Sequence, residues 1–258
     1  MSYQNILYEK EGKIGWITVN RPEVRNALNA ETLEDILAAL AEARNDEDVR
    51  VVIFTGAGDK AFVAGADIRI LVERTALDGL PSGFTEIFEK IEDFEKPTIA
   101  AVNGFAMGGG CELAMCCDLR VASETAKFGL PEVNLGIIPA GGGTQRLRNF
   151  VGVGRAKEMI YTGAVIDARE AERFGLVNKV VPAGELRAAA TELANKIIEK
   201  APLAVQMAKK SIHTGIRGGP VAGLAFEKHV QAILFGTEDK KEGTSAFLEK
   251  RKPQWKGR

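Results

Sequence analysis

The chain has 258 residues, of which 45% are hydrophobic and 27% charged, and these proportions are typical of a globular protein. Thirty-four basic and 35 acidic residues give a net charge of -1, without the basic excess of nucleic-acid-binding proteins. No apolar run approaches the ~20 residues of a membrane span, and the N-terminus does not resemble a secretory signal. We therefore expect a cytoplasmic protein with no nucleic-acid partner and no membrane partner.

Cysteine and histidine usage limits the possible chemistry. The three cysteines (Cys111, Cys116 and Cys117) lie in one short stretch, and their odd number argues against a disulfide framework. We expect them to be small, buried apolar residues. The chain has only two histidines, His213 and His229, which disfavours a histidine-based triad or a zinc site. We therefore expect neither a metal nor another cofactor.

The first two-thirds of the chain alternate β-branched runs with helical patterns. Asn29 is placed to cap a helix that begins at Ala30, and a shorter helix is expected near 110–117. The predicted strands cover residues 14–19, 49–55, 98–102 and 119–122. Their nearly continuous apolar character is typical of buried strands, and strand–helix–strand order implies parallel pairing with right-handed crossovers.

From about Glu185 the pattern predicts helices only. Pro202 opens one helix and Pro220 another, and an amphipathic helix is expected over 238–250. No low-complexity linker precedes this part, so we expect it to pack on the body or on a neighbouring subunit. The basic residues of the last segment, 250–258, fit a solvated tail or, alternatively, an anion-binding patch.

Glycine is unusually frequent, with 28 residues that cluster at 104–110 and 141–143. The first cluster joins a predicted buried strand to a helix, where free N–H groups can bind an anion or a developing oxyanion. The segment does not match a phosphate-binding loop. Glu112 lies one helical turn further on, where it can act as an acid or a base, or simply favour the helix dipole by ~0.3–1 kcal/mol. The sequence of this segment leaves both interpretations open.

A second loop, 64–67, follows another predicted buried strand. It can contribute an N–H group to the same oxygen as the first loop, although an ordinary turn capped by Asp67 is the simpler interpretation. Glu132 follows Pro131 at what resembles a helix start, and alone it is weak evidence for a site. Beside Glu112 it gains significance, because two neighbouring carboxylates push their pKa values apart and can divide acid and base roles.

Taken together, these motifs resemble the crotonase (enoyl-CoA hydratase/isomerase) superfamily, and most closely its enoyl-CoA hydratases and 3-hydroxybutyryl-CoA dehydratases. The resemblance implies an α/β fold: a crotonase (ClpP-like) spiral of ββα turns in residues 1–195, with a C-terminal helical oligomerisation region in 196–258. It also implies a homotrimer or a hexamer built as a dimer of trimers. The motifs that carry it are Arg21-Pro22, Asn26-Ala27-Leu28, KAFVAGADI (60–68), KPTIAAVNG (96–104), GGGCELA (108–114) and FGLPE (128–132).

The same resemblance assigns site residues. It implies an oxyanion hole made by the N–H groups of Ala66 and Gly109, and catalytic carboxylates at Glu112 and Glu132. One departure is Ala140, where the family often has glycine beside the expected water. The residues expected to bind coenzyme A are Arg25, Lys60, Ala64, Asp67, Ile68, Arg69 and, from a neighbouring subunit, Lys250.

The implied reaction is the reversible hydration of trans-2-enoyl-CoA to 3-hydroxyacyl-CoA in fatty-acid metabolism. By family precedent Glu132 donates the proton to C2 and Glu112 acts as the base toward water. An enoyl-CoA delta-isomerase is the alternative, and a non-catalytic RNA-binding homologue is a further one. The sequence does not specify the acyl chain length. It also leaves the pathway open among β-oxidation, butyrate formation and aromatic degradation. Residues 71–95 are expected to line the acyl tunnel, with a mobile loop at 78–83.

Overall fold

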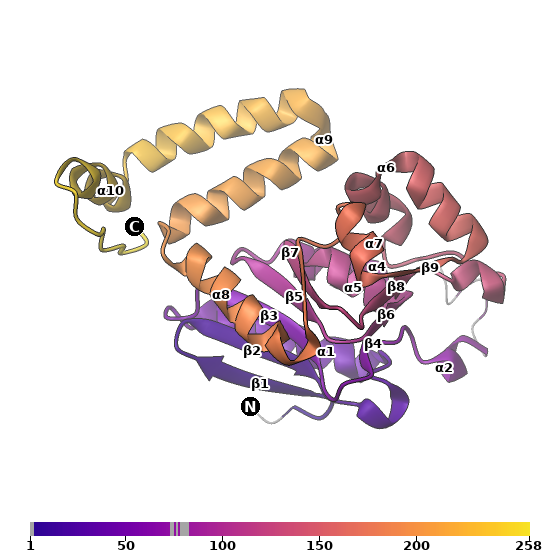
Figure 1. Cartoon of the computed structure of the whole chain (residues 1–258). Helices are drawn as coiled ribbons and strands as arrows, with labels where there is room; N and C mark the ends of the chain where they lie inside the picture. The colour runs from indigo at the N-terminus through magenta and orange to yellow at the C-terminus, as the bar shows by residue number, and fades with distance from the viewer. Residues whose placement is uncertain (1–2, 73–74, 76, 78–82) are drawn as a thin grey trace.

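The computed structural model of the chain describes residues 3–72, 75, 77 and 83–258. Apart from Gly83, the loop predicted at 78–83 lies outside these residues. Figure 1 shows a body of two sheets with their helices, from which the C-terminal helices extend.

Among the described residues, six strands form the larger sheet, in the order β1-β2-β3-β5-β7-β10. All neighbours are parallel except the β1–β2 hairpin. The predicted strands at 14–19 and 98–102 are confirmed, and the other two differ by one or two residues at their ends. The bounds are β1 (Ile6–Glu11), β2 (Ile14–Val19), β3 (Val51–Gly56), β5 (Thr98–Val102), β7 (Leu119–Ser123) and β10 (Lys179–Val181).

A smaller sheet, which the sequence analysis did not predict, contains four described strands in the order β4-β6-β8-β9. Each has only three residues, which is too short for hydrophobic periodicity to reveal. β4, β6 and β8 each follow a strand of the larger sheet and pair in parallel, whereas β9 is antiparallel. This repeat of a strand in each sheet followed by a helix is the expected ββα spiral. The bounds are β4 (Ala61–Val63), β6 (Phe105–Met107), β8 (Lys127–Gly129) and β9 (Val165–Asp167).

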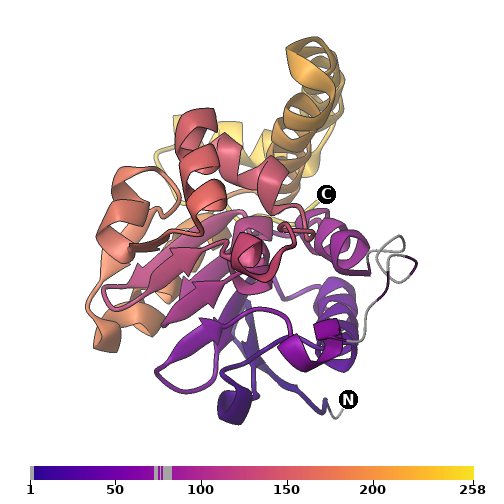
Figure 2. The same cartoon turned by 90° about the vertical axis from the view of Figure 1, so that its right-hand side faces the viewer.

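Helices cover both faces of the larger sheet (Figures 1 and 2). Along β2, Trp16 faces the cluster under α8, whereas Ile17 faces the cluster that contains α1, α4 and α5. The four predicted strands, β2, β3, β5 and β7, are therefore buried on both faces, as their apolar runs predicted, whereas β1 is largely exposed. Asn29 caps α1 by accepting a hydrogen bond from the Thr32 N–H, as expected. Within the described part of the body, the helices are η1 (Pro22–Val24), α1 (Ala30–Asn45), α2 (Ile68–Val72), α4 (Gly83–Glu92), α5 (Gly109–Cys116), η2 (Glu132–Leu135), α6 (Gly143–Thr162), α7 (Ala168–Arg173), η3 (Ala183–Glu185) and α8 (Leu186–Ile198).

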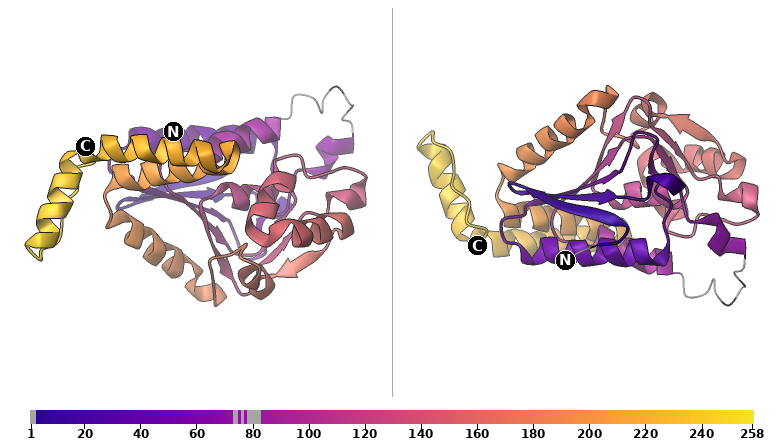
Figure 3. Two further views of the ribbon diagram at one scale, coloured as in Figure 1. Left: turned by 90° about the horizontal axis from the view of Figure 1, so that it is seen from above. Right: turned by 90° about the horizontal axis from the view of Figure 1, so that it is seen from below.

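The C-terminal region consists of α9 (Pro202–Phe235) and α10 (Glu238–Leu248). Gly219 has φ 80° and ψ 170°, which breaks α9 into two arms immediately before Pro220, so the predicted helix start there is confirmed. Figures 1 and 3 show the second arm folded back along the first. The predicted domain boundary at 195/196 falls inside α8, and the chain leaves the body after that helix. The division into two domains stays a prediction.

None of the helices that the structure describes is both long enough and apolar enough to cross a bilayer.

The side chain of Asn26 connects the segment that follows β2 to the link between β3 and β4 and to the first residue of β4. We expect the loss of Asn26 to destabilise the fold. Its side chain accepts from the Arg21 N–H at 3.0 Å and donates to the carbonyls of Ala57 at 3.0 Å and Ala61 at 2.8 Å. Asn26→Ala should lower the free energy of unfolding by roughly 2–4 kcal/mol, because it removes three hydrogen bonds, each worth about 0.5–1.5 kcal/mol. Urea denaturation measures this. The exposed Asn149 on α6 provides the control, since Asn149→Ala should change stability by less than about 0.5 kcal/mol. Equal effects of the two substitutions would contradict the role of Asn26.

Candidate active site

One cavity brings together both glycine-containing loops and both glutamates. It has a volume of about 420 Å³ and lies among α2, α4, the N-terminus of α5, η2 and the loop that leads into α6. Apolar side chains form most of its wall, and the polar groups come from a few positions. It is lined by Ala64, Gly65, Ala66, Ile68, Leu71, Phe84, Met107, Gly108, Gly109, Glu112, Pro131, Glu132, Asn134, Leu135, Ile137, Ile138, Ala140 and Gly141.

The two backbone bends predicted to share an oxygen lie next to each other. A Cβ atom on Gly109 would lie 3.7 Å from the backbone nitrogen of Ala66. Leu28 donates to the Gly65 carbonyl at 2.8 Å and accepts from the Asp67 N–H at 3.0 Å, so these bonds hold both sides of Ala66 without using its own N–H. Gly109 is the first residue of α5, where the N–H has no partner within the helix. Two N–H donors therefore border the same part of the cavity.

Glu112 is almost completely buried, with 3% of its surface exposed, and hydrogen bonds hold its carboxyl in place. Its Oε1 accepts hydrogen bonds from the N–H groups of Gly141 at 2.8 Å and Gly143 at 2.7 Å. Burial raises the pKa of the Glu112 carboxyl, and the two N–H donors and the charge of Arg146 oppose that rise. The glycine cluster at 141–143 thus serves as the anchor of Glu112, a role that the sequence analysis did not assign.

Glu132, at the start of η2, has a different environment. Burial, together with a smaller contribution from the nearby charge of Glu112, raises the pKa of its carboxyl to about 7. Its Oε2 is buried without a hydrogen-bond partner among the described residues. Gly108 has φ 49°, a conformation that favours glycine, and a Cβ there would lie 2.9 Å from Oε1 of Glu132 and would displace that carboxyl. The Glu132 carboxyl therefore lies at the N-terminus of α5 and is free to bind another molecule.

The residues predicted to contact coenzyme A are only partly gathered around the cavity. Ala64 and Ile68 line it. Asp67 is buried beside it and accepts from Arg69 at 2.6 Å, an interaction that lowers the pKa of Asp67 to about 2. The Arg69 side chain is 75% exposed, and Lys60 is exposed as well.

Two other predicted contacts lie outside the cavity wall. Arg25 is exposed, with φ 54°, and its carbonyl accepts from the Ala64 N–H at 3.1 Å. Lys250 follows α10, and Figure 1 shows α10 and α2 at opposite ends of the molecule. Lys250 is therefore far from the cavity of its own chain, and its predicted contact with a neighbour's ligand stays a prediction.

The departure at Ala140 causes no backbone strain. Among the described residues other than glycine, positive φ is confined to Arg25, Asn26 and Lys250. Ala140 thus has a conformation suited to alanine. The segment 71–95, expected to line the acyl tunnel, contributes Leu71 and Phe84 to the cavity wall. Leu135 and Ile137 also line it and were not predicted.

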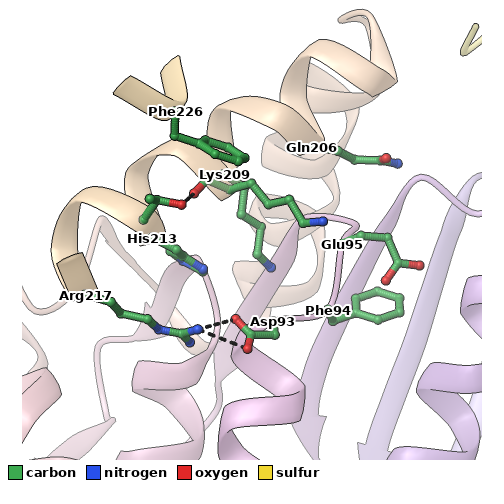
Figure 4. A pocket seen from close by; sticks show the side chains of 10 residues that line it. Asp93, Phe94, Glu95, Gln206, Lys209, His213, Arg217 and Phe226 are labelled. Atoms are coloured by element: carbon green, nitrogen blue, oxygen red, sulfur yellow. Dashed lines mark hydrogen bonds and ion pairs between the residues drawn. The ribbon is translucent and has the colours of Figure 1, made fainter. Parts of the chain in front are cut away.

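A second cavity, of about 450 Å³, lies between the first arm of α9 and the end of α4 (Figure 4). Several of its charged groups are paired within the protein. Arg217 is directed at Asp93, with nitrogen and oxygen 2.8 Å apart, and Lys209 donates to Asp118 at 2.9 Å. The pairing makes this cavity a weaker candidate for catalysis than the one that contains Glu112 and Glu132.

The described residues contain no group of three or more acidic, cysteine or histidine side chains placed to hold a metal ion. The three cysteines are buried free thiols, as predicted, and burial raises the pKa of Cys111 and that of Cys117 to about 12. Such thiols are poor nucleophiles, because the thiolate is the reactive form.

Two glutamate carboxyls and two N–H donors around one cavity form a site that can stabilise an enolate and transfer protons. Comparison with known proteins agrees with this class. The Enoyl-CoA hydratase/isomerase family matches residues 9–258. The chain belongs to this family.

The similarity to individual relatives extends over the whole chain. It is 50% identical to the short-chain-enoyl-CoA hydratase of Clostridium acetobutylicum, over 98% of this chain and 97% of the relative. It is 49% identical to the crotonyl-CoA hydratase of Syntrophomonas wolfei, over 98% of both chains. Among solved structures, the enoyl-CoA hydratase of Bacillus anthracis superposes with a TM-score of 0.94 at 43% identity, over 99% of this chain and 100% of that one.

The raised pKa of Glu132 predicts a pH-dependent stability. Between its ordinary value of 4.5 and about 7, the unfolded chain loses this proton while the folded chain keeps it. The folded state then binds more protons, so the contribution of Glu132 to the free energy of unfolding falls as pH rises through this window. Glu132→Gln should therefore stabilise the protein more near pH 8 than near pH 5. Urea denaturation at both pH values measures the difference, with Glu124→Gln as an exposed control. A gain in stability that is the same at both pH values would refute the assignment.

Proposed function

We propose that this protein is an enoyl-CoA hydratase, a hydro-lyase that reversibly adds water to trans-2-enoyl-CoA to give 3-hydroxyacyl-CoA. The observation that carries the proposal is the presence of Glu112, Glu132 and the N–H groups of Ala66 and Gly109 around one cavity. The names of the relatives from C. acetobutylicum and S. wolfei support it.

The N–H pair suits the charge that develops during hydration. When water adds to C3, electron density moves to the thioester oxygen and forms an enolate. The N–H groups of Ala66 and Gly109 would donate to that oxygen, and one such donor is typically worth ~2.7–4 kcal/mol in the transition state. The apolar wall excludes bulk water and so strengthens these hydrogen bonds.

The two carboxyl groups suit opposite proton transfers. Glu132 has a pKa of about 7, so it carries a proton in a large fraction of molecules near neutral pH and can protonate C2. Glu112 accepts two backbone N–H groups, which favour its ionised form and suit it to take a proton from water. Because the reaction consists of proton transfers and enolate stabilisation, it requires no redox or metal cofactor.

The remaining contacts are part of the same proposal. Coenzyme A would lie along Ala64, Asp67 and Ile68, with the exposed Lys60, Arg69 and Arg25 available to its phosphates. Lys250 would come from a neighbouring subunit of a trimer or of a hexamer. The exposed apolar side chains of the C-terminal region support such an assembly; they are Ile212, Ile216, Val221, Leu224, Ile233, Phe235, Phe247 and Leu248. The cytoplasmic location and the role in fatty-acid metabolism are also proposals.

Substitution of the glutamates tests the mechanism. Glu112→Gln and Glu132→Gln should each lower kcat for crotonyl-CoA hydration by roughly 10²–10⁴-fold, because each removes a proton-transferring group. Binding of acetoacetyl-CoA should persist. Loss of the ultraviolet absorbance of the conjugated thioester measures hydration, and calorimetry measures binding.

Three outcomes would count against the proposal. Near-normal kcat in either variant would refute the paired-carboxylate mechanism. Conversion of a 3-enoyl-CoA without hydration of crotonyl-CoA would favour the delta-isomerase, which needs a single carboxylate. Salt-sensitive RNA retention without hydratase activity would favour the RNA-binding alternative.

The cavity also supports a preference for short acyl chains. A smaller apolar cavity of about 140 Å³ adjoins the active-site cavity, and Ala66, Leu71 and Phe84 line both. A Cβ on Gly109 would lie 3.6 Å from Cε1 of Phe84, so this ring lies beside the proposed thioester position. Phe84 therefore forms a wall between the acyl site and the space beyond it.

Phe84→Ala should join the two cavities and admit longer chains. We expect kcat/KM for trans-2-octenoyl-CoA to rise roughly tenfold or more relative to crotonyl-CoA, since each accommodated methylene is worth about 1–3 kcal/mol. Steady-state kinetics over a series of enoyl-CoA lengths measures the ratio. Phe84→Tyr serves as the control, because it keeps the ring. An unchanged ratio in Phe84→Ala would show that Phe84 does not limit chain length.

A further inference from the structure

The loop that holds Glu112 cannot determine its own shape. It contains three consecutive glycines at 141–143, and Gly142 has φ 97°. Glycine has the largest backbone freedom of all residues, so this conformation must be imposed from outside the loop. The N–H groups of Gly141 and Gly143 must nevertheless stay in place, because both donate to Oε1 of Glu112.

Arg146 supplies one such contact from outside the three glycines, and the Thr85 hydroxyl donates to the carbonyl of the adjoining Ala140. Arg146 lies in the first turn of α6, and its side chain is 10% exposed. Its Nη1 donates to the Gly141 carbonyl at 2.6 Å. A Cβ on Gly142 would lie 2.0 Å from the same Nη1, which shows how closely the guanidinium packs on the loop. Gly141 is therefore fixed at its carbonyl by Arg146 and at its N–H by Glu112.

Glu92, at the end of α4, connects Arg146 to the C-terminal helices. Its Oε2 accepts from Nη2 of Arg146 at 3.0 Å and from Nη2 of Arg217 at 2.9 Å. Arg217 lies in the first arm of α9, two residues before the break at Gly219, and Figure 4 shows it directed at Asp93. An unbroken series of charged contacts thus runs from α9 to the loop that binds Glu112.

We infer that Arg146 is a positioning residue for Glu112, and that Arg217 supports it through Glu92. The C-terminal helices would then contribute to turnover through their own chain, in addition to any role in assembly. The inference rests on the proposed function only in using hydration of crotonyl-CoA as its readout.

Arg146→Met tests the first contact. With the loop released, Glu112 loses its alignment with the bound water, and misplacement of about 1 Å can cost roughly 10²-fold in rate. We expect kcat for crotonyl-CoA hydration to fall between tenfold and 100-fold, with KM and acetoacetyl-CoA affinity changed less than about threefold. The proposed oxyanion donors, Ala66 and Gly109, are not touched by the substitution. Arg146→Lys should recover part of the rate, because lysine can still donate to the Gly141 carbonyl.

Arg155→Met is the matched control for Arg146→Met. Arg155 lies on the same helix and pairs with Glu158 through an exposed ion pair outside the loop, so kcat should be unchanged. Thermal denaturation of every variant, with kinetics measured well below the transition, separates a loss of folded protein from a loss of alignment.

Arg217→Met tests the remote end of the series. We expect a two- to tenfold fall in kcat, and the double variant with Arg146→Met should be no slower than Arg146→Met alone, because Arg217 acts through the same contact. Multiplying effects, or normal kcat with a lowered melting temperature, would refute the inference and leave a purely structural role. Failure of the unsubstituted protein to hydrate crotonyl-CoA would instead refute the proposed function.

Discussion

The burial of the Glu112 carboxylate is the constraint on which the rest of the site depends. A buried charge is tolerated only when hydrogen bonds replace the lost water, and here two backbone N–H groups do so. The donors must approach closely, which excludes side chains between them and the carboxylate: a Cβ on Gly141 would lie 2.6 Å from Oε2 of Glu112. The glycine loop and the guanidinium of Arg146 that holds it both follow from this requirement.

The two-layer spiral solves a second problem, which is to bring two distant bends to one point. β3 and β5 are parallel neighbours in the larger sheet, and β4 and β6, which follow them, are parallel neighbours in the smaller one. The segments that follow β4 and β6 therefore begin at the same edge of the smaller sheet. The bends at Ala66 and Gly109 meet because each follows the corresponding strand.

Ion pairs and a hydrogen bond connect the first arm of α9 to the loop that binds Glu112. Arg217 shares Glu92 with Arg146, and it lies on the arm of α9 that also exposes Ile212 and Ile216. A subunit packed on those apolar residues would also restrict Arg217. Assembly and alignment of Glu112 would then depend on the same short segment of α9.

The amino-acid sequence by itself determined four strands of the larger sheet (β2, β3, β5 and β7, but not β1 or β10), the helical C-terminal region and the loops of the site. These are local features, set by apolar periodicity and by glycine and proline. Only the tertiary structure decided the smaller sheet, since its three-residue strands exist through pairing alone. It also decided the anchoring of Glu112 by Gly141 and Gly143, and the contacts from Arg146 to Glu92 and Arg217. Those groups are far apart along the chain, and no local pattern specifies which of them will meet.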